Sequence, residues 1–145
     1  MSDARISGDS TRLWMLAAAI KQIGSDEFRQ SLLEQIGDYA LDRIREEFLV
    51  GRDPYGNPWE PLKRPRMGFG GPLLKTGRLQ NGMRKRVSKK MVKIYNNRPY
   101  APFHQNGTKS IPARPMLPDR LPDEWRAEFE RMADEAIRRA LSGVL

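Results

Sequence analysis

The sequence predicts an α+β fold in which helices flank a small antiparallel sheet. Two segments, 26–50 and 122–145, have apolar residues at helical spacing on one side. Between them, β-branched residues lie on both sides of Lys89-Lys90, a pattern typical of a β-hairpin. We therefore expect N-terminal helices and a long C-terminal amphipathic helix packed around this sheet, with a long Pro/Gly-rich loop between them.

Two helices are expected in the N-terminal third. The first, short helix is capped by Ser10 or Asp9 and stops at Gly24. The second is capped by Ser25 or Asp26, and its apolar residues recur every four positions: Phe28, Leu32, Ile36, Ala40, Ile44 and Phe48. Such a stripe predicts that the second helix packs lengthwise on a sheet or another helix.

A long irregular loop follows the second helix, which Gly51 ends. Residues 52–72 hold five prolines and four glycines, with Tyr55, Trp59 and Phe69 as their only aromatic anchors. One helical turn capped at Thr76 is expected before the hairpin. Loops of this length in a compact domain usually carry function or order on a partner.

The hairpin is expected to pair residues 83–88 with 91–96. Val87, Val92 and Ile94 supply its buried face, and basic side chains line the other face. After it we expect a helical turn at 100–105 and a short edge strand at 110–111, which Pro112 stops.

The C-terminal helix has the clearest signal. Pro122 stands in its first turn, where the acidic Asp123 and Glu124 complement the positive end of the helix dipole. Its apolar residues are Trp125, Phe129, Met132, Ala133, Ala136, Ile137, Ala140 and Leu141.

The 145 residues predict one domain, because a chain of this size buries roughly 70% of its unfolded surface. Its parts are a helical region (1–50), the long loop (51–82), the hairpin with a Pro-rich loop (83–118) and the C-terminal helix (119–145). The absence of cysteine excludes disulfides and fits a reducing compartment, with the cytoplasm as the default. The apolar run 13–20 is too short to cross a bilayer, so no membrane is expected.

Charge is segregated along the chain. Residues 52–120 hold 16 basic and 3 acidic residues, a net of +13, whereas the two flanks together carry a net of −5. A basic middle between acidic ends fits three interpretations: a surface that faces nucleic acid, head-to-tail stacking of copies, or a solvated basic face.

No constellation of residues supports catalysis. His104 is the only histidine, residues 61–118 contain no Asp or Glu, and no serine sits in a nucleophile elbow. The stretch 68–76 (GFGGPLLKT) lacks the glycine spacing of a phosphate-binding loop. The acidic residues of the second helix are interpreted as a solvated face: Glu27, Glu34, Asp38, Glu46 and Glu47. We expect no enzyme, no metal site and no cofactor, and a structural hydrogen-bonding role for His104.

Several blocks of sequence occur in an order that resembles one family. They are 53–62 (DPYGNPWEPL), 74–79 (LKTGRL), 92–96 (VKIYN), 100–101 (YA) with 104–107 (HQNG), and 111–117 (IPARPML). Together they resemble the phage virion morphogenesis, or tail completion, family of Mu-like and related tailed phages. The resemblance covers residues from about 48 to 117, and a C-terminal amphipathic helix follows as in that family.

The resemblance implies a structural protein of the phage neck that completes the tail or joins head and tail. It implies a homo-oligomer whose copies form a ring, with six-fold symmetry favoured, at the head–tail junction of the virion. The expected partners are neighbouring neck proteins and the tail tube or tail terminator.

Four residues are candidates for contacts with another subunit or partner. Trp59 is interpreted first as a residue that anchors the loop by packing, and second as a partner contact, because tryptophan is often found at interfaces. Tyr100 and His104, four apart, are expected to tie their turn to the sheet. Arg114 is expected to contact another subunit, because Pro112 and Pro115 hold it on a stiff backbone and arginine pairs well with carboxylates.

The basic hairpin is the candidate DNA-facing surface. If it lines the lumen of a ring, six side chains would make transient contact with genomic DNA: Arg84, Lys85, Arg86, Lys89, Lys90 and Lys93. The alternative function is a free, non-sequence-specific nucleic-acid-binding protein that uses hairpin residues 84–93. Tyr95 is the only aromatic residue among these cations, so phosphate contact rather than base stacking is expected.

Overall fold

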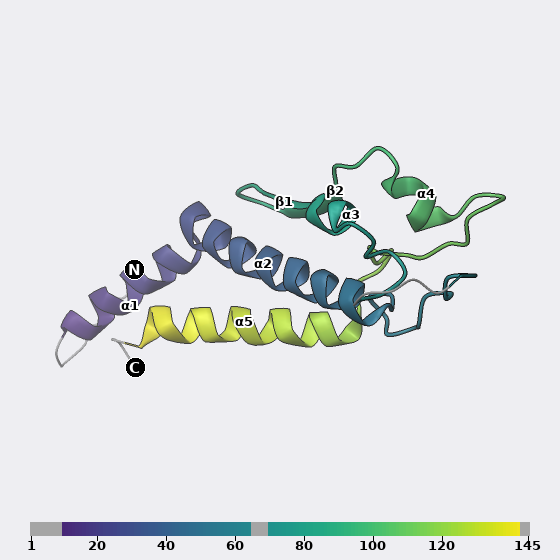
Figure 1. The fold of residues 1–145 in the computed structure, drawn as a ribbon. Helices are drawn as coiled ribbons and strands as arrows, with labels where there is room; N and C mark the ends of the chain where they lie inside the picture. The colour runs from purple at the N-terminus through teal and green to yellow at the C-terminus, as the bar shows by residue number, and fades with distance from the viewer. Residues whose placement is uncertain (1–9, 65–69, 143–145) are drawn as a thin grey trace.

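The structure is a computed structural model that describes residues 10–64 and 70–142. These residues form five helices and one two-stranded antiparallel sheet, which makes the fold α+β as predicted (Figure 1). In chain order the elements are α1 (Ser10–Ile23), α2 (Asp26–Val50), α3 (Arg78–Asn81), β1 (Met83–Val87), β2 (Val92–Asn96), α4 (Ala101–Asn106) and α5 (Asp123–Leu141).

Helix α2 lies in the middle of the molecule. The hairpin of β1 and β2 packs on one side of it, α5 runs along another side, and α1 contacts both α2 and α5 (Figure 1). The long helices α1, α2 and α5 thus lie on one side of the sheet, with α2 between the hairpin and α5 (Figure 1). A two-stranded sheet offers one apolar face, and α2 covers it, so that α5 packs on α2 instead.

Both ends of α2 are fixed by the residues that the sequence indicates. The Ser25 hydroxyl accepts a hydrogen bond from Phe28 N at 3.1 Å. At the other end Gly51 adopts φ 85°, and its N–H donates to the Glu47 carbonyl at 2.7 Å. In mid-helix, a Cβ on Gly37 would lie 3.0 Å from Val92 Cγ2, so glycine lets the hairpin approach the helix closely.

The core sits at the C-terminal half of α2, where several loops converge. Its largest fully buried side chains are Phe48, Ile44, Met83 and Met116. Phe48 packs edge-to-face on Trp59, with ring centroids 5.6 Å apart. A second aromatic contact holds α5: the Tyr39 ring lies edge-to-face against Phe129 at 5.7 Å and against Trp125 at 6.4 Å.

The hairpin forms with the predicted strands, and Met83 pairs with Asn96 and Val87 with Val92. Val87, Val92 and Ile94 are half-buried on the face toward α2, and Met83 is the fully buried residue of that face. Because residues alternate along β1, Lys85 also lies on the inner face, between Met83 and Val87. The expectation that all the basic residues line the outer face is therefore wrong for Lys85.

The described part of the loop after α2 is irregular, as predicted, but hydrogen bonds hold it. The Asp53 carboxylate accepts from Tyr55 N and Asn57 N, each at 2.9 Å, and Trp59 N donates to the Gly51 carbonyl at 2.9 Å. This short closed loop brings Trp59 back onto the end of α2.

Two local expectations are corrected. The α3 turn is capped by Gly77 at φ 77° rather than by Thr76, whose hydroxyl accepts from Arg78 N at 3.4 Å. Residues 110–111 form no strand: the Thr108 hydroxyl accepts from Ser110 N and Ile111 N, which closes a turn in place of an extended edge.

The C-terminal helix begins one residue after Pro122, which is its N-cap rather than a residue of its first turn. None of the helices within residues 10–64 and 70–142 combines the length and the apolar character needed to cross a membrane.

Candidate functional site

Trp59 is a packing anchor of the loop after α2. Its side chain is buried against Phe48, and its indole Nε1 donates to the Pro115 carbonyl at 2.8 Å. This bond ties the loop after α2 to the Pro-rich loop before α5. A buried indole N–H needs such an acceptor, so the contact stabilises both loops.

Arg114 is an internal clamp. Only 6% of the residue is exposed. Its Nε donates to the Glu60 carbonyl at 2.7 Å and its Nη2 to the Pro61 carbonyl at 3.3 Å. We expected a guanidinium presented to another subunit, but the structure places it inside. The two irregular loops leave carbonyls without ladder partners, and the guanidinium satisfies two of them.

Tyr100 and His104 pack on each other at the α4 turn. Their rings meet edge-to-face with centroids 6.2 Å apart, and Tyr100 packs against the core. Burial lowers the pKa of His104, and the nearby positive charge of Arg114 lowers it further. The lowered pKa favours the neutral imidazole. Its Nδ1 is buried without a hydrogen-bond partner among the described residues, so the hydrogen-bonding role expected for the ring is not seen. The backbone carbonyl of His104 instead accepts from Arg114 N at 2.7 Å.

The basic hairpin has two chemically different faces. On the inner face, Lys85 Nζ lies 2.7 Å from Glu34 and also contacts Asp38, both on α2. The hydrogen bonds with Asp38 and Glu34 raise the pKa of Lys85. Lys85 therefore forms an ion pair between β1 and α2 and is not a free cation. Lys89 lies 3.6 Å from Asp26 of α2.

On the outer face, the register places Arg84 opposite Tyr95 and Arg86 opposite Lys93. The Lys93 ammonium lies 5.8 Å from the centre of the Tyr95 ring. Within the described residues, neither Arg86 nor Lys93 has a carboxylate partner, and Lys90 in the turn has none either. This outer hairpin face, Arg84, Arg86, Lys93 and Tyr95, is a cationic surface without acidic neighbours on its own strands.

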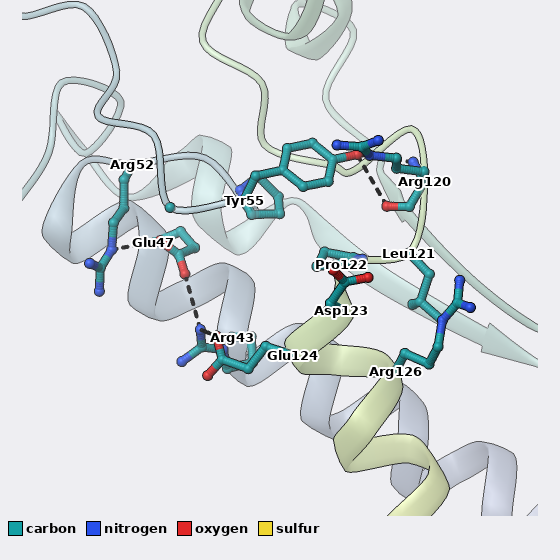
Figure 2. Close-up of a pocket in the computed structure, with 12 residues that line it drawn as sticks. Arg43, Glu47, Arg52, Tyr55, Arg120, Leu121, Pro122, Asp123, Glu124 and Arg126 are labelled. Atoms are coloured by element: carbon teal, nitrogen blue, oxygen red, sulfur yellow. Dashed lines mark hydrogen bonds and ion pairs between the residues drawn. The ribbon is translucent and has the colours of Figure 1, made fainter.

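A charged cleft of about 710 Å³ lies where the end of α2 meets the start of α5 (Figure 2). Four arginines line it together with three acids: Arg43, Arg52, Arg120 and Arg126, and Glu47, Asp123 and Glu124. Tyr55 spans its edge: its hydroxyl contacts the Asp119 carboxylate and accepts from Arg120 N at 3.0 Å. The hydrogen bond from Tyr55 lowers the pKa of Asp119.

Glu47 is the buried charge of this cleft. Its side chain is 3% exposed and lies between Arg52, 3.2 Å away, and Arg43, 3.6 Å away. Burial raises the pKa of Glu47, and the two arginines offset part of this effect. Arg43 also reaches Glu124 at 3.3 Å, so the buried carboxylate and the start of α5 share one guanidinium (Figure 2).

Sequence reasoning missed the cleft because Glu47 was grouped with the solvated acids of α2. The helical spacing could have indicated that Glu47 is buried, because it follows Ile44 by three residues and Ala40 by seven, on the edge of the buried stripe. Glu34 and Asp38 were also misassigned, since both pair with Lys85. An acid at a core-stripe position indicates a partner, here Arg43 and Arg52.

The arrangement has few features of an active centre. Among the residues that the structure describes, no three His, Asp or Glu side chains gather to hold a metal ion. His104 faces Arg114 rather than a carboxylate that would orient it as a base. What the geometry provides is rigid loops, an ion-paired cleft and a cationic hairpin face.

The model of the phage virion morphogenesis family matches residues 12–142. The chain belongs to that family. Neither the search of curated proteins nor that of solved structures found a match.

Membership in the virion morphogenesis family gives the chain a role in the assembly of phage particles, in line with a structural rather than a catalytic protein. The match begins at residue 12 and ends at 142, so it includes α1 and α5, which the resembling blocks do not cover. Apart from the first two residues of α1, the described helices and the hairpin thus fall within the matched residues.

Substitution of Arg114 tests the internal clamp. Arg114→Lys keeps the charge but cannot reach both carbonyls, so we expect a loss of about 1–3 kcal/mol in the free energy of unfolding by urea titration. Arg86→Lys, on the exposed outer face, is the matched control and should change stability by less than about 0.5 kcal/mol. An unchanged stability for Arg114→Lys would contradict the clamp.

The pH dependence of Glu47→Gln tests the buried carboxylate. Because the folded-state pKa of Glu47 is raised, its stabilising contribution is fully present below the ordinary pKa and is lost as pH rises through the folded-state value. Glutamine does not titrate, so the variant should gain stability relative to the wild type as pH rises from 3.5 to 7. The opposite trend for Glu47→Gln would show that ion pairing outweighs burial.

Proposed function

We propose that the chain is a structural, non-catalytic protein of the phage neck that acts in tail completion and head–tail joining as a ring-forming subunit. The observation that carries this proposal is the family match across nearly the whole chain. The proposed location is the head–tail junction, and the proposed partners are further copies, neighbouring neck proteins and the tail tube or tail terminator.

Three physical features support an assembly role. Arg114, Trp59 and Asp53 make the irregular loops rigid without another subunit, so the chain can present a preformed surface. The outer hairpin face and the cleft lie on different parts of the molecule and differ in charge (Figures 1 and 2). A ring subunit needs two different surfaces that meet heterologously, so such asymmetry suits a ring.

A second candidate function is contact with nucleic acid through the outer hairpin face. The observation that favours it is the charge pairing. The acids of α2 are largely taken by internal partners: Asp38 by Lys85, for example, and Glu47 by Arg52. The outer hairpin face keeps its cations unpaired by carboxylates, which suits a phosphate backbone. Lys85 leaves the expected DNA-facing set, because it pairs with Glu34 and Asp38 of α2. Lys89 stays in the set, since its side chain is 70% exposed and its pair with Asp26 is a surface one.

Deletion of the gene tests the neck role. A phage that lacks this chain should accumulate filled heads and separate, full-length tails, and its infectious titre should fall by several orders of magnitude. Immunogold label against the protein should lie at the head–tail junction of complemented particles. Joined, infectious particles from the deletion, or label confined to another part of the virion, would overturn the proposal.

Paired substitutions test the nucleic-acid contact. Arg86→Ala with Lys93→Ala should weaken binding to a short DNA duplex and lower the slope of log K against log salt by about 1.8, since each lost phosphate contact is worth about 0.9. Lys75→Ala with Lys109→Ala removes two exposed cations elsewhere and serves as the control. Equal effects of the two pairs would indicate that only net charge matters, and no DNA binding by the wild type would end this candidate function.

A further inference from the structure

Helix α1 is apolar on most of its surface, but the fold buries one side of it. Leu16, Ala19 and Ile23 face the contacts with α2 and α5 and are buried or half-buried. Trp14 and Ile20 remain 73% and 59% exposed. A helix that is apolar all round is normally buried all round, so the free side of α1 needs a partner.

The free side of α1 has a defined shape and charge. Trp14, Ala17, Ala18 and Lys21 follow one another at helical spacing and are all exposed. We call these four residues the α1 stripe. The indole projects beside two small alanines, which leave room for a close approach. Lys21 has no carboxylate partner within the described residues, so the stripe ends in an unpaired cation.

A second exposed surface, near the C-terminal end of α2, has complementary properties. Leu49 is 55% exposed, and it follows Asp42 and Glu46 at helical spacing. Asp42 and Glu46 are 73% and 60% exposed, and each has only arginines of α2 itself as partners. Val50, 60% exposed, extends the apolar part. We call Asp42, Glu46, Leu49 and Val50 the α2 stripe.

The two stripes lie at opposite ends of α2. The helix has 25 residues, which span about 37 Å at a rise of 1.5 Å per residue. Figure 1 shows α1 at the N-terminal end of α2, far from the end that leads into the loop after Val50. One chain cannot bring its own stripes together, but two copies can.

We propose that the α1 stripe of one copy docks on the α2 stripe of the next copy, with Trp14 against Leu49 and Val50, and Lys21 facing Asp42 and Glu46. This proposal rests on the ring-forming role proposed above and names the two faces of its repeating contact. Apolar residues then cover apolar residues, and a cation meets two carboxylates. Because the two faces differ and lie at opposite ends, repetition of the contact produces a closed ring when the rotation permits.

The size of the stripes sets the strength of the contact. Trp14, the one large apolar residue of the α1 stripe, is 73% exposed and offers on the order of 150 Å² of apolar surface. Stable complexes bury about 800 Å² per partner, so this contact alone is weak. Isolated chains should therefore be largely monomeric when dilute and should assemble where a neighbouring structure gathers them.

Engineered disulfides test the contact directly, because the chain has no cysteine. We would mix the single variants Ala18→Cys and Leu49→Cys at high concentration under mild oxidation. The mixture should give a disulfide-linked dimer that contains one of each, neither variant alone should do so, and the double variant should give a ladder of oligomers. Ala18→Cys with Ala127→Cys, an exposed position on α5, is the control pair.

Three outcomes would overturn the contact. Dimers from Ala18→Cys alone would show that α1 pairs with α1, equal yields with the control pair would show random collision, and no product would show that the stripes do not meet. In the double variant, Trp14→Ala should lower the yield of the ladder at least tenfold without changing the free energy of unfolding, since the indole is exposed in the monomer.

An experiment on complemented phage particles distinguishes a failure of this contact from a failure of the neck role. The double variant is supplied to the deletion phage, and the particles are both oxidised and immunolabelled. Label at the neck with no ladder would reject this contact and leave the neck role standing. A ladder in solution with no label at the neck would reject the neck role and leave the contact between the stripes standing.

Discussion

Helix α2 has to bury side chains toward two different neighbours along most of its length, and the rest of the structure depends on this. Toward the hairpin it offers Gly37 and Ile44, and toward α5 it offers Tyr39. At its C-terminal end both sides converge on Phe48, whose side chain is completely buried. The loop after α2 and the Pro-rich loop before α5 are both held at this end of α2 through Trp59, so loss of packing there would release loops that are distant in sequence.

Ion pairs also stabilise the packing of α2 against the hairpin and against α5. Lys85 binds the hairpin to Glu34 and Asp38, and Arg43 joins Glu47 to the first turn of α5. These pairs connect elements that are distant in sequence, where their geometry depends on the fold. Such use of the acids of α2 leaves Arg86 and Lys93 of the outer hairpin face without carboxylate partners among the described residues, which favours an anionic partner for that face.

Residues whose environment is set by local periodicity were predictable from the sequence. The caps at Ser25 and Gly51, the strands of the hairpin and the apolar stripe of α5 depend on neighbours in the chain. The role of Arg114 was not predictable, because its partners are two carbonyls more than fifty residues away. Its flanking prolines indicated a stiff backbone but not whether the guanidinium points inward.

The same limit applies to the hairpin and the cleft. Alternation along β1 indicated that Lys85 shares a face with Met83. Only the packing of the hairpin on α2 shows that this face brings Lys85 next to Glu34. The cleft is formed by segments near residues 47, 55 and 120, which no local pattern connects. The family resemblance, by contrast, needed only the order of short blocks, and the family match over 12–142 confirms it.

In the proposed neck role, the chain would combine an internally clamped body with exposed stripes that contact neighbouring copies. The most direct measurement is electron cryomicroscopy of the intact virion, with focused reconstruction of the head–tail junction. The account predicts a ring of copies of this fold at the junction, each α1 lying on the C-terminal part of the neighbouring α2. A well-resolved neck that contains no copy of this chain would contradict it.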